Sequence, residues 1–411
     1  MDHNSRFLLK SFRKYYKEYD PVPYMPERYT KREFGFMFFD KEMMQRHLGF
    51  TTPDDLKKFM IAQVPKHSYY STAYYRRPAA PTMDEKEWLG AELIFDLDAD
   101  HLAGADQMTY DEMMIQIRSE MMNLVDSFLY SDLGFDENQV HLMFSGGRGY
   151  HAHVLMPDIA TLGTHERREL VDYITCSGLD IDWIFPFHTV ALGQYKTSSG
   201  ASRTNTTEDR TIPPADSGGW KLKMRNGLRE VVNDLCDLDV KELKKAYPSI
   251  HGTQNQSIVK VQENIKKSRS TMFEKNTMAS LAKPSQKLLI KIMQEDKARM
   301  ISGEVDKPVT PDIKRLIRLP GSVHGKTGLK VTPITRDELT DYNPLLYAVP
   351  ETYSDEPTKV TLRRDYQLNM KDVRLSLKKG ETEVPEFAAV FLVGRKEANY
   401  GFDSEQKDSF F

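Results

Sequence analysis

The segment Ala91–Asp98 has the pattern of a buried strand that ends in two aspartates. Side chains alternate between the faces of a strand, so Asp96 and Asp98 should share one face while Phe95 and Leu97 take the other. Adjacent carboxylates repel each other unless a cation lies between them, and hard divalent cations such as Mg²⁺ or Mn²⁺ favour oxygen-rich sites of this kind. Aspartates at strand ends also form turns and helix caps. The pair is therefore compatible with either a metal site or a structural turn.

The composition indicates a globular chain rather than a membrane or disulfide-rich protein. The chain has 411 residues, of which 39% are hydrophobic and 28% charged, enough for two domains or for one domain with a large insertion. No apolar run approaches the ~20 residues of a membrane span, and the N-terminus lacks a signal-peptide pattern. Cys176 and Cys236 lie far apart, which argues against a disulfide framework or a four-ligand zinc site. We expect a cytoplasmic protein.

Positive charge is local, because the formal net charge is only −3. One basic patch lies on an expected first helix, residues 5–18, where aromatic residues are interleaved with the cations. A second is the run Lys260–Lys275, which includes Lys266, Lys267 and Arg269. Most such runs are solvated faces, so neither patch alone establishes nucleic-acid binding.

The hydrophobic pattern predicts an α/β chain that is interrupted by a helical insertion. Helices are expected at residues 53–63 and 109–129, and strands at 32–39, 67–75, 91–98, 140–144 and 150–156. Residues 196–219 are polar and should form an exposed loop, residues 222–299 should be helical, and strands should return at 302–306, 328–334 and 385–393. We therefore expect a discontinuous α/β domain of residues 1–195 and 300–411, with residues 196–299 inserted as a loop and helical subdomain.

A glycine-rich turn, Ser145-Gly-Gly-Arg-Gly149, joins two of the expected strands. Closely spaced glycines let backbone N–H groups form an anion-binding nest, and Arg148 offers a planar fork for phosphate oxygens. An ordinary hairpin turn is the simpler alternative. His151 and His153 follow on one strand face, where hydrogen-bonded histidines are commoner than metal ligands.

A third polar segment begins at Val305. Thr310, Pro311 and Asp312 have the pattern of a helix start, which gives Asp312 a capping role. Asp306, at the end of the expected preceding strand, has no such role and is our candidate third carboxylate.

The same segment continues with a dense set of cations. On the predicted helix, Arg315 and Arg318 would lie one turn apart. The helix should break at Pro320-Gly321, and His324 and Lys326 follow in a tight loop. So many cations need an anionic partner, and either a triphosphate or a structural ion-pair network would supply it.

Three motifs in this order resemble those of the small catalytic subunit of archaeal and eukaryotic DNA primases. They are Phe-Asp-Leu-Asp at 95–98, Ser-Gly-Gly-Arg-Gly-Tyr-His at 145–151 and Arg-Leu-Pro-Gly-Ser-Val-His-Gly-Lys-Thr-Gly at 318–328. Stretches that begin at Arg32 and Pro65 also resemble that family. The resemblance covers roughly residues 5–155 and 300–330. It implies a primase-polymerase fold with a helical subdomain, and template-directed synthesis of short RNA or DNA primers on single-stranded DNA for replication.

Site residues follow from the resemblance position by position. Asp96, Asp98 and Asp306 would be the catalytic carboxylates that hold two Mg²⁺ or Mn²⁺ ions. The residues implied to contact the NTP or dNTP are Ser145, Arg148, His151, Arg318, His324 and Lys326, with Arg32 and Lys66 as further positions. The expected partner is a large primase subunit with an iron–sulfur domain, in a heterodimer.

One departure concerns zinc. The family commonly carries a Cys/His zinc knob just after the Asp-x-Asp strand, but residues 99–140 here contain no cysteine and only His101. We therefore expect no bound zinc.

Two other classes of function compete with this interpretation. A metal-dependent glycosyltransferase would also use an Asp-x-Asp pair, but it would not require the cationic loop at residues 318–326. A non-catalytic nucleic-acid-binding subunit could keep the basic patches, but it would have no reason to keep three carboxylates. The test is whether Asp96, Asp98 and Asp306 converge in the fold.

Overall fold

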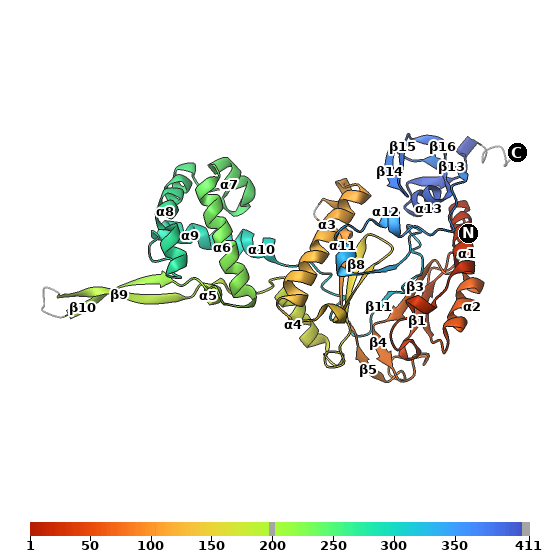
Figure 1. Ribbon diagram of the computed structural model, residues 1–411, viewed down its shortest axis with the longest axis horizontal. Helices are drawn as coiled ribbons and strands as arrows, with labels where there is room; N and C mark the ends of the chain where they lie inside the picture. The colour runs from red at the N-terminus through yellow and green to blue at the C-terminus, as the bar shows by residue number, and fades with distance from the viewer. Residues whose placement is uncertain (103, 197–201, 405–411) are drawn as a thin grey trace. The chain divides into compact units, whose positions relative to one another are not determined.

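The computed structural model describes residues 1–102, 104–196 and 202–404, which form two compact units (Figure 1). Unit 1 comprises residues 1–130, 134–171 and the chain from 304 onward, and unit 2 comprises residues 131–133 and 172–303. Helix α4 (Thr164–Ile174) crosses the division. The boundaries predicted after residues 195 and 299 fall instead within strand β9 (Phe187–Lys196) and helix α10 (Ala298–Ile301).

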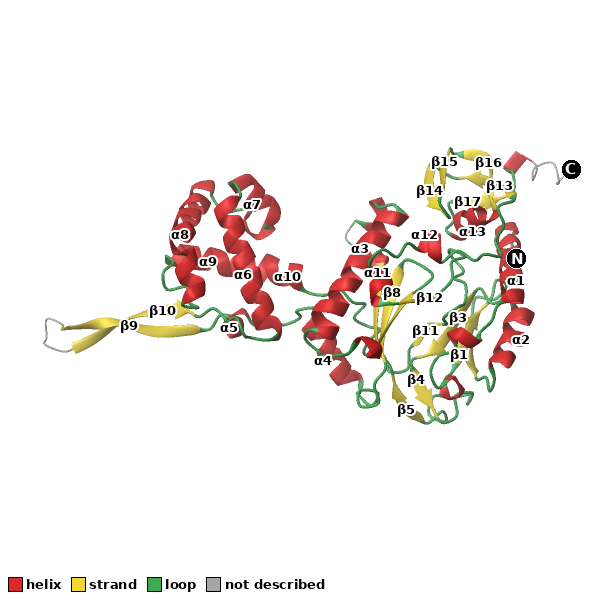
Figure 2. Ribbon diagram, in the orientation of Figure 1, coloured by secondary structure: helices red, strands yellow, loops and turns green. Residues whose placement is uncertain are grey.

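Two four-stranded antiparallel sheets form the centre of unit 1 (Figure 2). The first has the order β11-β3-β1-β2, with strands Leu316–Arg318, His67–Ser71, Phe34–Met37 and Gln45–Leu48. The second has the order β12-β7-β8-β6, with strands Thr332–Ile334, Val140–Phe144, Gly149–Val154 and Leu93–Asp98. A short ribbon of β4 (Ala73–Tyr75) and β5 (Trp88–Ala91) continues from the first sheet.

Several helices of unit 1 begin at side-chain caps and bury an apolar face. Helix α1 (His3–Glu18) starts at Asp2, which accepts a hydrogen bond from the Ser5 amide, and it buries its aromatic residues. Helix α2 (Pro53–Gln63) is capped by Thr52. Helix α3 (Tyr110–Asn123) starts with a Thr109/Glu112 capping box, continues as a π-helical segment, Leu124–Tyr130, and packs on β6 and β8. Two short helices, α11 (Arg336–Leu339) and α12 (Pro344–Tyr347), follow β12.

A small module completes unit 1 after α12. Strands β13 (Pro357–Leu362), β16 (Gly380–Pro385) and β17 (Ala398–Tyr400) form one sheet, and β14 (Tyr366–Met370) pairs with β15 (Val373–Leu377). Helix α13 (Glu386–Gly394) is buried along almost its whole length and packs against α1 and β13. The first and last segments of the described chain therefore lie together.

Unit 2 is mostly helical. Its helices are α5 (Ile181–Ile184), α6 (Gly219–Asp237), α7 (Val240–Ala246), α8 (Asn255–Glu274), α9 (Lys283–Ile292) and α10. Helix α6 contacts α5, α8, α9 and α10, and it supplies much of the apolar core of this unit. Strand β9 pairs antiparallel with β10 (Ser202–Arg210). None of the described helices in either unit is both long and apolar enough to cross a membrane.

Four predicted elements are corrected by the structure. Residues 385–393, predicted as a strand, are mostly helix α13, because a short apolar run fits a buried helix as well as a buried strand. Part of the predicted loop 196–219 is strand β10, and residues 197–201 lie outside the described part of the chain. Residues 302–306 form no strand.

The fourth correction concerns the helix predicted to begin at Thr310. The Thr310 hydroxyl instead donates to the Ile94 carbonyl over 2.7 Å, and the Asp312 side chain accepts from the Lys314 amide over 3.0 Å. The chain then enters β11, which pairs with β3 at the edge of the first sheet. The residues with the helix-start pattern form a turn instead, because pairing of the following strand stabilises this segment more than an isolated helical turn would.

Candidate active site

The three predicted carboxylates converge at the end of strand β6. Asp96 and Asp98 project from β6 opposite His151 and Gly149 of β8, while Phe95 and Leu97 are buried. Asp306 reaches the same place from a loop, and its backbone N–H donates to the Asp96 carbonyl over 2.8 Å. The sheet and one backbone hydrogen bond therefore fix the relation between two segments that are far apart in the sequence.

The pKa of Asp96 reflects its burial and the acids near it. Burial, together with the nearby charges of Asp98 and Asp306, raises the pKa of Asp96 to about 7, although Arg315 and Arg318 oppose the shift. Within the described residues no group of three or more acidic, His or Cys side chains is already arranged to coordinate a metal ion. The donors are nevertheless the oxygen ligands that hard cations prefer.

The glycine-rich turn Ser145–Gly149 lies beside the carboxylates. The Ser145 hydroxyl accepts from the Gly147 amide over 3.3 Å, and the Tyr110 hydroxyl donates to the Gly147 carbonyl over 2.8 Å. Arg148 forms an ion pair with Asp100, just beyond Asp98. This turn is a hairpin, as the simpler interpretation held, and it also presents Ser145, Gly147 and Arg148 to a cavity.

His151 is an internal neighbour of the acids. Its Nε2 lies 3.4 Å from Asp96 Oδ1, and its Nδ1 is buried with no hydrogen-bond partner among the described residues. Burial and the charges of His153, Arg318 and Arg315 hold the pKa of His151 well below its usual value. A neutral imidazole at this position can donate a hydrogen bond from Nε2 to the Asp96 carboxylate without adding a positive charge to the site.

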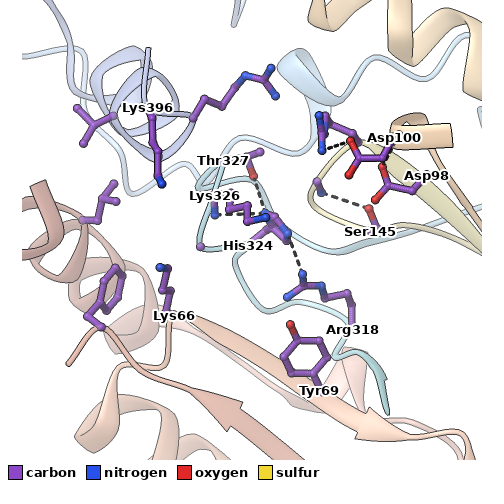
Figure 3. A pocket seen from close by; sticks show the side chains of 18 of the residues that line it. Lys66, Tyr69, Asp98, Asp100, Ser145, Arg318, His324, Lys326, Thr327 and Lys396 are labelled. Carbon is purple, nitrogen blue, oxygen red and sulfur yellow. Dashed lines mark hydrogen bonds and ion pairs between the residues drawn. The ribbon is translucent and has the colours of Figure 1, made fainter. Parts of the chain in front are cut away.

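Arg318, on β11, is held by two histidines. Its Nη1 lies 2.7 Å from His67 Nδ1, its Nη2 lies 3.0 Å from His324 Nε2, and its guanidinium stacks 4.5 Å from the Tyr69 ring centre (Figure 3). Burial and the nearby cations hold the pKa of both histidines well below their usual value. His324 is therefore a neutral group that positions Arg318, in addition to lining the cavity.

One cavity of about 880 Å³ collects these groups. The acids on its wall are Asp2, Asp96, Asp98 and Asp100, and the cationic side chains are Lys66, Arg148, Arg315, Arg318, Lys326, Arg363, Arg395 and Lys396. Ser145, His151 and His324 also line it. Of the predicted site residues, Asp306 and Arg32 do not.

Arg32 is a correction. Its side chain is fully buried and forms an ion pair with Glu92, while Nη1 donates to the Ser71 carbonyl over 2.8 Å and the guanidinium stacks on Tyr74. It ties the start of β1 to Glu92 and to the end of β3. A structural ion pair explains its place better than a nucleotide contact does.

The sequence analysis missed several residues at the site: Tyr69, Arg395 and Lys396 line the cavity, and His67 contacts Arg318. Tyr69 and His67 belong to an aromatic segment that already resembled the primases, so their involvement could have been proposed from sequence. Arg395 and Lys396 follow a buried apolar run, and only the packing of α13 brings them to the cavity. Nothing in the sequence links them to residues 318–328.

The two basic patches lie mostly outside this cavity. The aromatic residues of α1 are core residues, and Lys14 forms an ion pair with Glu386. Lys266, Lys267 and Arg269 are exposed on α8 of unit 2. Cys176 and Cys236 are both free.

Comparisons with known proteins identify the family of this chain. A sequence model of the family described as DNA primase small subunit matches residues 95–336. The DNA primase small subunit of Methanococcoides burtonii is 36% identical over 406 residues, which cover 98% of this chain and 100% of the relative. That of Methanocella arvoryzae is 38% identical over 408 residues, with 97% and 99% covered, and that of Picrophilus torridus is 36% identical over 395 residues, with 95% and 97% covered. This chain belongs to the DNA primase small subunit family.

Proposed function

We propose that this chain is the catalytic subunit of a DNA primase, a nucleotidyltransferase that makes short primers on single-stranded DNA for replication. The observation that carries the proposal is one cavity lined both by carboxylates and by arginine, lysine and histidine side chains. A triphosphate needs cations along its phosphates and a metal site at the reacting end, and this distribution of charge supplies both.

The carboxylates fit a divalent cation. Burial and, after it, the neighbouring carboxylates raise the pKa of Asp96, and a bound cation would offset the repulsion between these carboxylates. Asp96, Asp98 and Asp306 would hold Mg²⁺ or Mn²⁺. When bound, such ions activate the primer 3′-hydroxyl and neutralise the departing pyrophosphate.

The protein's own groups would bind and orient the nucleotide. Arg148 and Arg318 offer planar guanidinium groups to phosphate oxygens, and the two histidines that contact Arg318 keep it in place. Lys66 and Lys326 add charge further along the cavity. Because these donors are held before the substrate arrives, little reorganisation is needed when charge develops on the phosphates.

The partners in this proposal are a larger primase subunit, single-stranded DNA and NTPs or dNTPs. The name of the relatives, small subunit, supports a larger partner. The family resemblance implies that this partner carries an iron–sulfur domain.

Primer synthesis on circular single-stranded DNA tests the proposal. The wild-type chain, alone and with the large subunit, is supplied with NTPs or dNTPs and with Mg²⁺ or Mn²⁺, and labelled products are separated by length. We expect short products from the wild type and none from Asp98→Ala. A wild-type heterodimer that binds DNA but makes no product with either metal would instead indicate a non-catalytic subunit.

A further inference from the structure

Three lysines from separate segments meet at one end of the cavity. Lys66 precedes β3, Lys326 lies in the loop after β11, and Lys396 follows α13 in the C-terminal module. In Figure 3 the side chains of Lys66 and Lys396 extend toward each other across the open space, with the Lys326 loop beside them. Lys396 corresponds to none of the motifs that identify the family.

Two glycines bring these segments together. A Cβ at Gly325 would lie 2.4 Å from Lys66 Cγ and 2.7 Å from the Lys66 carbonyl oxygen. A Cβ at Gly394 would lie 3.0 Å from both the carbonyl carbon and the carbonyl oxygen of Lys326. The backbones around Lys66, Lys326 and Lys396 are therefore in direct contact, and the end of α13 has a defined place at the site.

The backbone of Lys396 is unusual for a lysine. Its φ is +63°, and the turn that ends α13 has the hydrogen bonds of a Schellman motif, from Lys396 N–H to the Val393 carbonyl and from Glu397 N–H to the Leu392 carbonyl. Glycine is the favoured residue at this position, because a side chain is disfavoured in the left-handed region. A lysine at this position therefore makes the fold less stable than a glycine would. Its side chain reaches the cavity.

The charges at this end lack a matching set of carboxylates. Burial, followed by the repulsion of Lys396 and Lys326, lowers the pKa of Lys66, and Asp2 opposes this only weakly. The catalytic acids Asp96 and Asp98 line the same cavity next to Arg148 and Arg318 instead. The cluster has the composition of a phosphate site.

We propose that Lys396 completes, with Lys66 and Lys326, a subsite for the terminal phosphate of a nucleoside triphosphate. The inference rests on the proposed function and deepens it, because it makes the C-terminal module part of the nucleotide site. Lys396 is then a binding residue that discriminates triphosphates from monophosphates.

Lys396→Gly is the decisive variant, because glycine removes the ammonium group and relieves the left-handed backbone. The matched control is Lys371→Gly. Lys371 has a φ of +50° in the same module, is not among the residues that line the cavity, and lies 3.5 Å from Asp355. Calorimetric titrations with ATP and with AMP, in Mg²⁺ and without template, measure binding apart from turnover. Thermal unfolding measures stability, and titration with labelled single-stranded DNA separates nucleotide phosphates from DNA phosphates.

We expect Lys396→Gly to weaken ATP binding at least about tenfold, as the loss of a charged hydrogen bond to phosphate should. AMP and DNA affinities should stay within about twofold of the wild type, and the melting temperature should be unchanged or higher. Lys371→Gly should bind ATP normally. Unchanged ATP binding by Lys396→Gly, an equal loss of AMP binding, or a loss of DNA affinity instead would each overturn the inference. A wild-type chain that binds no nucleotide at all would overturn the proposed function itself.

Discussion

The carboxyl group of Asp96 shows how the site is built at the scale of single residues. It lies among Asp98, Asp306, Arg315 and Arg318, and burial and the other acids raise its pKa to about 7 from an ordinary value of 3.8. The folded protein therefore binds this proton more tightly than the unfolded chain does. Ionisation of Asp96 costs stability, which is lost progressively as the pH rises from about 4 to about 7.

Asp96→Asn should remove this cost. In the absence of divalent cations, the variant should be more stable than the wild type at pH 8 by on the order of 2 to 4 kcal/mol, and about equally stable at pH 4. Urea denaturation of both proteins in EDTA across this pH range measures the difference. A constant difference at all pH values would show that Asp96 does not titrate as described.

Arg32, which the resemblance implies to lie near the nucleotide, is a buried partner of Glu92 in the structure. Burial alone would raise the pKa of Glu92, but Arg32 and the hydrogen bond with His153 outweigh it and hold that pKa below its usual value. Removal of one partner would leave the other charge buried and unpaired. The motif resemblance could identify Arg32 as important, but it could not separate a contact to substrate from a buried ion pair.

Arg32→Ala should therefore act on stability. We expect the free energy of unfolding to fall by ~3 to 5 kcal/mol, whereas Lys326→Ala should leave stability nearly unchanged. ATP titrations at a temperature where both variants are folded should show the reverse order, with only Lys326→Ala weakened. A folded Arg32→Ala protein that fails to bind ATP would restore the nucleotide role.

At the scale of elements, patterns with a strong period were predicted well. The alternation Phe95, Asp96, Leu97, Asp98 placed two acids on one strand face, and the helix expected from residue 109 begins as α3 at Tyr110. The predictions for Thr310–Asp312 and Phe387–Val393 were wrong. A local cap signal and a short apolar run carry no information about the sheet edge or the helices that surround these segments in the fold. Tertiary contacts determine the secondary structure of both segments.

The convergence of elements depends on close backbone approaches that no local pattern reveals. Gly325 is the clearest case, because its missing side chain lets the loop after β11 contact Lys66 and His67. Gly325→Ala should destabilise the protein by ~1 to 3 kcal/mol and raise the Michaelis constant for nucleotide. Gly252→Ala is the control, since nothing lies within 4 Å of a Cβ there. Chemical denaturation and steady-state kinetics would measure both effects, and a normal Gly325→Ala protein would refute the packing argument.

At the scale of the whole molecule, the two units offer different chemistry. Unit 1 holds the cavity with its acids and cations, and unit 2 carries the exposed cations Lys266, Lys267 and Arg269 on α8. The sequence indicated both the site residues and the basic run on α8. It could not show whether this run binds template or only faces solvent, because a positively charged helix face is compatible with either.

If α8 contacts template, neutralising Lys266, Lys267 and Arg269 together should weaken binding to single-stranded DNA and flatten its dependence on salt concentration. Nucleotide affinity should stay the same. Arg318→Ala should do the opposite, with weaker nucleotide binding and DNA affinity close to wild type. Fluorescence titrations with labelled DNA at several salt concentrations decide this, and equal losses of both affinities in Arg318→Ala would contradict the division.

The central claim is that Asp96, Asp98 and Asp306 form one nucleotidyl-transfer site, and addition of a single nucleotide to an annealed primer tests it most directly. Rates are compared for the wild type, the three alanine variants and Asp312→Ala, an acid on the same segment as Asp306 that accepts a hydrogen bond in a turn. We expect each of the three alanine variants to lose at least about a hundredfold in rate, as loss of a metal or transition-state contact does, while Asp312→Ala keeps most of its activity. An active Asp306→Ala protein together with an inactive Asp312→Ala protein would contradict the assignment.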